Sequence, residues 1–452
     1  MKKGVKKLLD FLYKRPEVVF VLIAVPFGAF SAFYVPQMSV TDEDSHLLRA
    51  YQVARGEFVC HKSSMYPQDV IDMFTKDFSD VSDVIDESDQ KKFVCGSAAG
   101  YAPIAYIPQA VGITFAKATH PTVASMVFMA RIANLFVYIL ALYLIIKKVR
   151  VGKYVFFVIA LIPQMIHLAA SLSADTINNV IVLGIVALVF NLFIQKQKIS
   201  KKQILLLIIL IAAVAVLKRN LILVLFPLAF LPAQLFKENK NNKIPFNVHK
   251  WTLAAAAALM FGITYLIWSK LSFVYTVPAV GLPNPIEIHP NLFINLLFNT
   301  YLSDYGDLVL RGVFGEFSSF LYHFPTILVF LQIVILLLAY LYDPQRNIRT
   351  LAQNKWLVIS MTSAFILSVF AITYGLYTEW GLKRGIQEYA DGVQGRYFTA
   401  LLVLLVPLFA WIGKYVSIRV KSEKFLFLIV ASGQVLILAF YVLYTVKTLL
   451  GK

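Results

Sequence analysis

Long apolar segments recur along this 452-residue chain, separated by short polar loops. About 20 residues of helix cross the hydrocarbon core of a bilayer, and most of these segments approach that length. Only 15% of the residues are charged, whereas a soluble domain has about a quarter. A helix satisfies its own backbone hydrogen bonds within lipid. The sequence therefore predicts an all-α integral membrane protein.

Eleven transmembrane helices are expected, and basic residues separate them in alternate loops, as at Lys147, Lys148 and Arg150. Such loops are retained on the cytoplasmic side. The net charge of +17 therefore indicates topology, and nucleic acid is not an expected partner. We expect a multi-pass protein of a bacterial plasma membrane, with a cytoplasmic N-terminus and an extracytoplasmic C-terminus. The expected spans are 17–36, 123–146, 152–170, 177–195, 203–217, 219–236, 252–270, 321–342, 355–378, 397–416 and 425–446.

Two long extracytoplasmic loops are expected, at 37–122 and 271–320, on a single membrane domain covering 1–452. Within the first loop, residues 101–118 are apolar but short and contain two prolines. Counting them as a span would place the basic loop at 147–150 outside. We therefore expect an amphipathic helix on the outer membrane surface.

The only two cysteines, Cys60 and Cys95, both lie in the first outer loop. An oxidising compartment makes a disulfide between them plausible. Sequence separation fixes no geometry, so two unpaired cysteines remain the alternative.

The segment TDEDSH, at 41–46, places Asp42, Glu43 and His46 directly after the first span. Its carboxylates are candidates for a catalytic base, and they are also candidate ligands for Mg²⁺ or Mn²⁺. The alternative is an ordinary acidic loop, since the rest of this loop is also acidic.

Several cations are expected at bilayer depth on the same outer side. Lys218 and Arg219 occupy the tip of a hairpin with short arms, and Arg131 lies within the outer half of the second span. Such charges need a counter-charge or a polar cavity. An anionic headgroup is one partner, and snorkelling to lipid phosphates is the alternative.

Two further outer positions carry candidate ligand-binding groups. Asp175 lies at a hairpin tip in SLSADTINN, where it is a candidate ligand-binding residue, with Asp42 a candidate metal ligand, and the alternative is a cap of the following helix. Arg396 and Tyr397 open a span from the outside, and a neighbouring glycine would let the backbone approach a ligand. An interfacial Arg–Tyr anchor is the alternative.

Several motifs together resemble the GT-C superfamily of polytopic glycosyltransferases. They are the YxPxxYxPQAxG stretch at 101–112, the Arg-Ile-Ala-Asn span start at 131–134, DExxH at 42–46, SLSAD at 171–175 and QGRY at 394–397. The last three are similar to motifs of a large group of uncharacterised bacterial multi-spanning proteins usually grouped with GT-C.

The resemblance implies inverting transfer of a sugar from a polyprenyl-phosphate-linked donor to an extracytoplasmic cell-envelope glycan or lipid. Asp42 would be the catalytic base or a metal ligand, with Glu43 as the adjacent acid. Asp175 matches the second acidic position, and Lys218, Arg219 and Arg396 match the phosphate-binding cations.

Three other functions remain open from the residues alone. A transporter or flippase of a lipid-linked saccharide would need a comparable inner site, and none is evident in the sequence. A polysaccharide polymerase or ligase would favour arginine and histidine in late loops. A non-catalytic assembly partner is the third.

Overall fold

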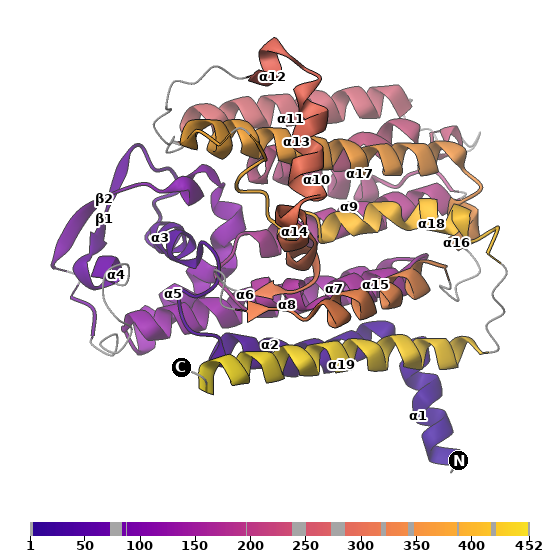
Figure 1. Ribbon diagram of the computed structural model, residues 1–452, viewed down its shortest axis with the longest axis horizontal. Helices are drawn as coiled ribbons and strands as arrows, with labels where there is room; N and C mark the ends of the chain where they lie inside the picture. The colour runs from indigo at the N-terminus through magenta and orange to yellow at the C-terminus, as the bar shows by residue number, and fades with distance from the viewer. Residues whose placement is uncertain are drawn as a thin grey trace.

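The long helices of the protein lie side by side and run largely along one direction (Figure 1). Helix α1 (Lys3–Lys14) lies at one end of this bundle, and the last turn of α19 lies at the other. This computed structural model describes residues 3–72, 84–86, 88–195, 197–236, 250–272, 285–317, 322–341, 348–386, 388–416 and 422–450.

Six helices are long and apolar enough to cross a membrane, counting only the residues that the structure describes. Many of their apolar side chains face outward, for example Leu22 and Leu443, which are 60% and 61% exposed. A lipid-facing surface has this character, so the prediction of a helical multi-pass membrane protein is confirmed. The six are α2 (Pro16–Tyr34), α6 (Val123–Lys148), α9 (Asp175–Ile194), α11 (Lys250–Leu271), α17 (Lys355–Leu376) and α19 (Glu423–Leu450).

The other five expected spans are short or broken helices, so the count of eleven stays a prediction. The break between α7 and α8 falls at Pro163, which has no backbone N–H to continue the first helix. Pro227 similarly lies within a 3₁₀ helix rather than a regular α-helix. These segments are α7 (Lys153–Ala160) with α8 (Pro163–Ala169); α10 (Lys201–Leu217); η4 (Arg219–Phe230) with η5 (Ala233–Leu235); α15 (Thr326–Leu341); and η8 (Gly395–Tyr397) with η9 (Ala400–Leu405) and α18 (Val406–Ile412).

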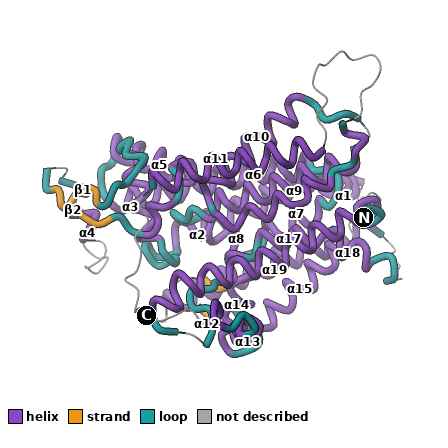
Figure 2. The backbone as a smooth tube through the Cα atoms, turned by 90° about the horizontal axis from the view of Figure 1, so that it is seen from above, coloured by secondary structure: helices purple, strands orange, loops and turns teal. Residues whose placement is uncertain are grey.

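The first outer loop gathers at the end of the bundle opposite α1 (Figures 1 and 2). It contains one feature that the sequence did not predict, an antiparallel hairpin in which Ser63 pairs with Val94 and Pro67 with Gln90. Its elements are α3 (Glu43–Ala54), β1 (Ser63–Pro67), α4 (Gln68–Asp72), β2 (Gln90–Val94), η2 (Ser97–Gly100), η3 (Pro103–Tyr106) and α5 (Ile107–Thr119).

Helix α5 forms most of the segment expected to lie on the membrane surface. It packs against the start of α6 so closely that a Cβ on Gly112 would lie 2.3 Å from the carbonyl oxygen of Met129. Its other face exposes an apolar stripe of Ile107, Val111 and Phe115, each more than half exposed. Such a stripe is typical of a helix in contact with a membrane surface.

The remaining short elements lie between α11 and α15 and on either side of α17. Gly395 lies against α14, where a Cβ would be 2.0 Å from the carbonyl oxygen of Val309. The glycine next to Arg396, expected to let the backbone approach a ligand, therefore lets it approach helix α14. The remaining elements are α12 (Pro285–Ile288), α13 (Leu292–Tyr301), α14 (Asp304–Phe314), β3 (Glu316–Phe317), β4 (Tyr322–His323), α16 (Ile348–Leu351), η6 (Tyr377–Gly381) and η7 (Leu382–Arg384).

Candidate functional site

Asp42 opens helix α3 in a conformation that frees its side chain. Its backbone is left-handed, with φ 62° and ψ 13°, and its carboxylate makes no capping hydrogen bond to the helix. Its carbonyl oxygen instead accepts from the backbone N–H of His46, which starts the helix. The carboxylate therefore faces away from α3, and the Asp42 side chain is 53% exposed.

Arg396 connects this exposed carboxylate to a buried one. Its guanidinium pairs with the carboxylate of Asp42, and its Nη1 donates to the carbonyl oxygen of Thr41 at 3.2 Å. Its Nε lies 3.7 Å from an oxygen of Asp175. The side chain of Arg396 is only 6% exposed. It therefore lies at the centre of a charged cluster with its solvent-facing side at Asp42.

Lys218 also forms an ion pair with Asp175. Asp175 is the first residue of α9, and its backbone N–H is capped by the hydroxyl of Ser173 at 3.2 Å. One oxygen of its carboxylate also accepts from the side-chain amide of Asn178. The Asp175 side chain is 8% exposed and that of Lys218 is 16% exposed. Two cations and two carboxylates from distant parts of the chain thus form one cluster.

Two tyrosine rings enclose the cations. The Nζ of Lys218 lies 4.4 Å from the ring centroid of Tyr397 and 6.0 Å from that of Tyr101. The guanidinium of Arg396 lies 5.4 Å from the Tyr397 ring. Burial raises the pKa of Tyr101 to about 12, although the charge of Lys218 opposes this shift. Tyr101 therefore remains a neutral phenol at physiological pH.

His46 lies next to the cluster, with its Nδ1 2.7 Å from the hydroxyl of Tyr106. Burial lowers the pKa of His46 to about 4. Asp42 and Asp175 act to raise this pKa, but burial outweighs them, and Arg396 and Lys218 lower it further. The ring is therefore neutral at pH 7, and it contributes hydrogen bonding rather than charge.

Glu43 and Arg131, expected as a catalytic acid and a substrate-binding cation, form a buried ion pair with each other. Arg131 donates to both carboxylate oxygens of Glu43, at 2.8 and 2.6 Å, and it also binds the carbonyl oxygens of Val35 and Pro36. The two side chains are 1% and 0% exposed. This pair ties the end of α2 to the start of α3, so its geometry fits positioning of Asp42 rather than contact with substrate.

The expected metal site does not match the donor set. No group of three or more His, Cys, Asp or Glu side chains that could hold a metal ion lies among the described residues. The carboxylates of Asp42 and Asp175 are already bound to Arg396 and Lys218, whose charges would repel Mg²⁺ or Mn²⁺.

Arg219 and the two cysteines complete the expected candidates. The backbone of Arg219 begins η4, but its side chain lies outside the described residues, so its place as a phosphate-binding cation stays a prediction. Cys60 and Cys95 form a disulfide, with their Cα atoms 6.4 Å apart. This bond closes the hairpin of β1 and β2 at its base.

Sequence reasoning missed Tyr101, Tyr106 and Asn178 as neighbours of the cluster. The first two belong to the YxPxxY stretch, which was used only to support the resemblance. Asn178 lies one turn after Asp175 on α9, and this spacing places the two side chains on one helix face. That spacing was the available signal.

These observations define a class, a polytopic helical membrane protein with a charged cluster at one end of its bundle. The chain belongs to the family described as "Predicted membrane protein (DUF2142)", whose model matches residues 73–405. The match includes Asp175, Lys218 and Arg396, whereas Asp42 precedes it. No curated protein and no solved structure matched the chain.

Proposed function

We propose that this protein is a membrane glycosyltransferase that moves a sugar from a polyprenyl-phosphate-linked donor to a cell-envelope glycan or lipid on the outer side of a bacterial plasma membrane. The observation that carries this proposal is the charged cluster, with buried Lys218 and Arg396 beneath the exposed carboxylate of Asp42. A phosphate needs the cations, and an acceptor hydroxyl needs an accessible base.

Arg396 would bind a phosphate by exchanging one of its two carboxylate partners for it. Its buried Nε has no hydrogen-bond partner among the residues that the structure describes. That Nε nevertheless lies 3.7 Å from an oxygen of Asp175, so a phosphate would reach the guanidinium by displacing one of its carboxylate partners. The Asp42 carboxylate is the more exposed partner of Arg396, so it is displaced at lower cost than Asp175.

Displacement of Asp42 from Arg396 by the phosphate would free Asp42 to act as the catalytic base. Once the phosphate is bound to Arg396, the carboxylate of Asp42 is released to accept the proton of an acceptor hydroxyl. The hydroxyl oxygen forms a bond to the anomeric carbon as the bond from that carbon to the phosphate oxygen breaks. The electron pair of this bond leaves with polyprenyl phosphate, whose added charge Arg396 and Lys218 stabilise. Attack opposite the leaving group inverts the anomeric centre.

The substitution Asp42→Asn tests this role without disturbing the backbone, because asparagine readily adopts the left-handed conformation found there. We expect sugar transfer from a radiolabelled polyprenyl-phosphate sugar to fall by about 10²- to 10⁴-fold, the usual contribution of a general base. The matched control is Asp44→Asn, since the carboxylate of Asp44 accepts from the adjacent backbone N–H of Ser45. Full sugar transfer by Asp42→Asn would contradict the assignment of Asp42 as the general base.

Transport of a lipid-linked saccharide is the second candidate, and one observation favours it. A cleft of about 1080 Å³ lies at the opposite end of α6 and α9 from the charged cluster. Arg150 and Lys355 line it together with Gln234, Gln353 and Asn354. A transporter would use anion-binding groups at both ends. Movement of a fluorescent polyprenyl-phosphate sugar across proteoliposomes, with no transfer to any acceptor, would favour this second function.

A further inference from the structure

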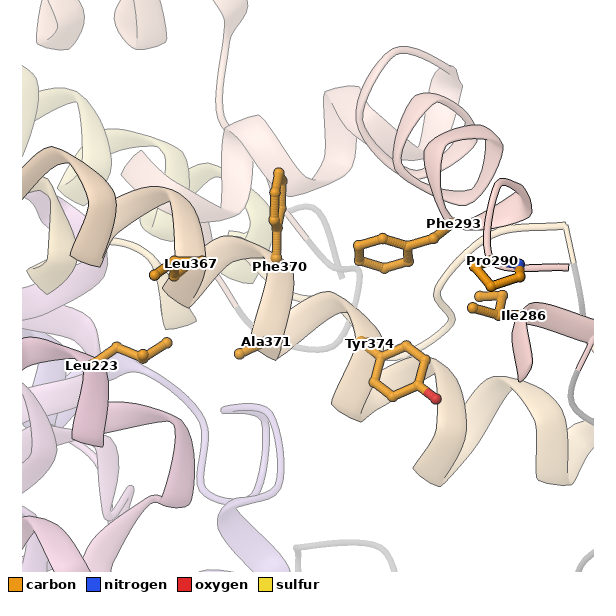
Figure 3. Close-up of a pocket in the computed structure, with 8 residues that line it drawn as sticks. All are labelled: Leu223, Ile286, Pro290, Phe293, Leu367, Phe370, Ala371 and Tyr374. Carbon is orange, nitrogen blue, oxygen red and sulfur yellow. The ribbon is translucent and has the colours of Figure 1, made fainter. Parts of the chain in front are cut away.

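The end of the bundle that the basic loops assign to the cytoplasm carries a cleft unlike the groove of Figure 3. That groove, between η4, α13 and α17, is lined mainly by apolar side chains, among them the rings of Phe293, Phe370 and Tyr374. The cleft instead combines two cations with several polar side chains. We call it the basic cleft, and its lining residues are Arg150, Phe193, Ile194, Gln234, Thr350, Gln353, Asn354 and Lys355.

Helix α9 holds the backbone of Arg150 in the wall of the basic cleft. The side-chain oxygen of Asn191 accepts from the backbone N–H of Arg150 at 2.8 Å, and its amide nitrogen donates to the carbonyl oxygen of Lys148 at 3.1 Å. The same helix supplies Phe193 and Ile194 to the lining. One helix therefore positions both a cation and the apolar part of the cleft.

Helix α17 presents its N-terminus to the basic cleft. Its N-cap, Asn354, accepts from two backbone N–H groups of the first turn, at 3.1 and 3.2 Å, and Lys355 is the first residue of the helix. The N-terminus of a helix carries a partial positive charge, which adds to the charge of Lys355. The Nζ of Lys414 donates to the carbonyl oxygen of Ala352 at 2.8 Å, so a third cation lies beside this segment. The electrostatic field in the cleft therefore favours an anion.

No carboxylate opposes these charges from the lining of the basic cleft, among the residues that the structure describes. The carboxylates of Asp10 and Glu423 lie on α1 and α19 at the same end of the bundle (Figure 1). Asp10 pairs with Lys424, and Glu423 accepts from the hydroxyl of Tyr13 at 2.7 Å. A cleft lined by one sign of charge concentrates ions of the opposite sign. The basic cleft therefore suits an anionic ligand.

The interior between the basic cleft and the charged cluster is closed in this conformation. Helix α9 runs from Asp175 to the cleft, and along it Val182, Val186 and Val189 are each at most 1% exposed. A charged group would not enter such an apolar interior without a partner. A ligand therefore reaches the cleft from the side opposite the charged cluster, and the two places are separate sites.

We propose that the basic cleft binds a ligand with a phosphate monoester group, independently of any sugar transfer at the charged cluster. A phosphate monoester carries a charge of about −1.5 to −2 at pH 7, which matches the two cations of the lining. Arg150 would donate to two phosphate oxygens, and Lys355 would act as a point charge. The carboxamide of Gln353 would bind a hydroxyl next to the phosphate, and Phe193 would contact carbon atoms. Such a phosphate belongs either to a lipid, as in phosphatidic acid, or to a soluble compound, as in glycerol 3-phosphate.

A fluorophore placed in the basic cleft tests the proposal and distinguishes the two sources. Cys60 and Cys95 form a disulfide, so a bimane label on the variant Gln353→Cys reports on the cleft alone. With the full-length protein in phosphatidylcholine nanodiscs, glycerol 3-phosphate is titrated in solution, and phosphatidic acid replaces increasing amounts of phosphatidylcholine in a second experiment. We expect a saturable change in bimane fluorescence. A label on Lys147→Cys, which is exposed at the same end and outside the lining, should show no saturable change.

Removal of both charges should weaken binding to the labelled protein. In Arg150→Gln combined with Lys355→Gln, we expect the concentration for half-saturation to rise at least about tenfold, because the phosphate loses its charged hydrogen bonds. Both residues are exposed, so the fold should tolerate the change. Lys147→Gln combined with Lys201→Gln is the control, because it removes the same charge from the same end outside the lining. Arg150→Lys combined with Lys355→Arg keeps both charges, so its half-saturation should stay within about threefold of the unchanged protein.

Saturation by phosphatidic acid alone would assign the basic cleft to a lipid headgroup, and saturation by glycerol 3-phosphate would show that a soluble phosphate is sufficient. Both outcomes support the proposal. It is overturned if neither compound saturates the fluorescence change, or if the neutral variant binds as tightly as the control variant. An equal loss of binding in the variant that keeps both charges would overturn it as well, because charge would then not be what binds the ligand.

Discussion

The buried pair of Arg131 and Glu43 gives the sharpest prediction about how this protein holds its site. Replacing Arg131 with methionine would leave the fully buried Glu43 carboxylate with one donor among the described residues, the backbone N–H of Leu172 at 3.3 Å. It would also remove the donors to the carbonyl oxygens of Val35 and Pro36. An isolated buried charge costs far more than a lost hydrogen bond.

We expect Arg131→Met to lower the free energy of unfolding by about 3–5 kcal/mol, the range for breaking a buried ion pair on one side. Glu43→Gln should also destabilise the protein, because it leaves the guanidinium buried without a counter-charge. The double variant should cost less than the sum of the two, since it leaves no unpaired charge in the interior. The free energy of unfolding of Arg131→Lys should lie between that of the unchanged protein and that of Arg131→Met, because an ammonium cannot donate to both carboxylate oxygens in the same way.

Unfolding in mixed dodecyl maltoside and dodecyl sulfate micelles, followed by tryptophan fluorescence, measures these differences. Arg384→Met is the matched control. Arg384 also pairs with an aspartate, Asp391, but its side chain is 53% exposed, so its loss should cost less than about 1 kcal/mol. If Arg131→Met lowers the free energy of unfolding no more than Arg384→Met does, or if the two losses simply add in the double variant, the reasoning is refuted.

Three further predictions concern the outer region. Between pH 6.5 and about 4, the unfolded chain binds a proton at His46 that the folded protein does not, so the free energy of unfolding should fall with falling pH by up to about 3 kcal/mol. Thermal unfolding of His46→Gln should lack that pH dependence, and an unchanged profile would contradict the burial argument. Reduction of the Cys60–Cys95 disulfide should speed limited proteolysis of the first outer loop, because the bond closes 35 residues; equal cleavage with and without reductant would argue against this role. Gly112→Ala should destabilise the protein by about 1–3 kcal/mol, since its Cβ meets the backbone of α6, whereas Gly262→Ala, with open space around it, should not.

Much of the charged cluster was predictable because its members share one property, charge at a helix end that the sequence assigns to the outer side. Asp42, Asp175, Lys218 and Arg396 each stand at a span boundary, and alternation of basic loops assigns all four boundaries to one side. The sequence could not predict which charges meet. Asp42 and Arg396 are 354 residues apart, and only packing of the spans brings them together.

The sequence by itself determined that the chain enters a membrane as helices, because apolar length and charge distribution alone decide that partition. It also supplied the candidates for the site. The tertiary structure decided their roles. Glu43 and Asp42 are adjacent carboxylates, but the fold turns the first toward buried Arg131 and the second toward solvent and Arg396. Asp42 has a left-handed backbone and Glu43 begins the helix, so these neighbours in sequence have different neighbours in space, and this divides a structural carboxylate from one that can act.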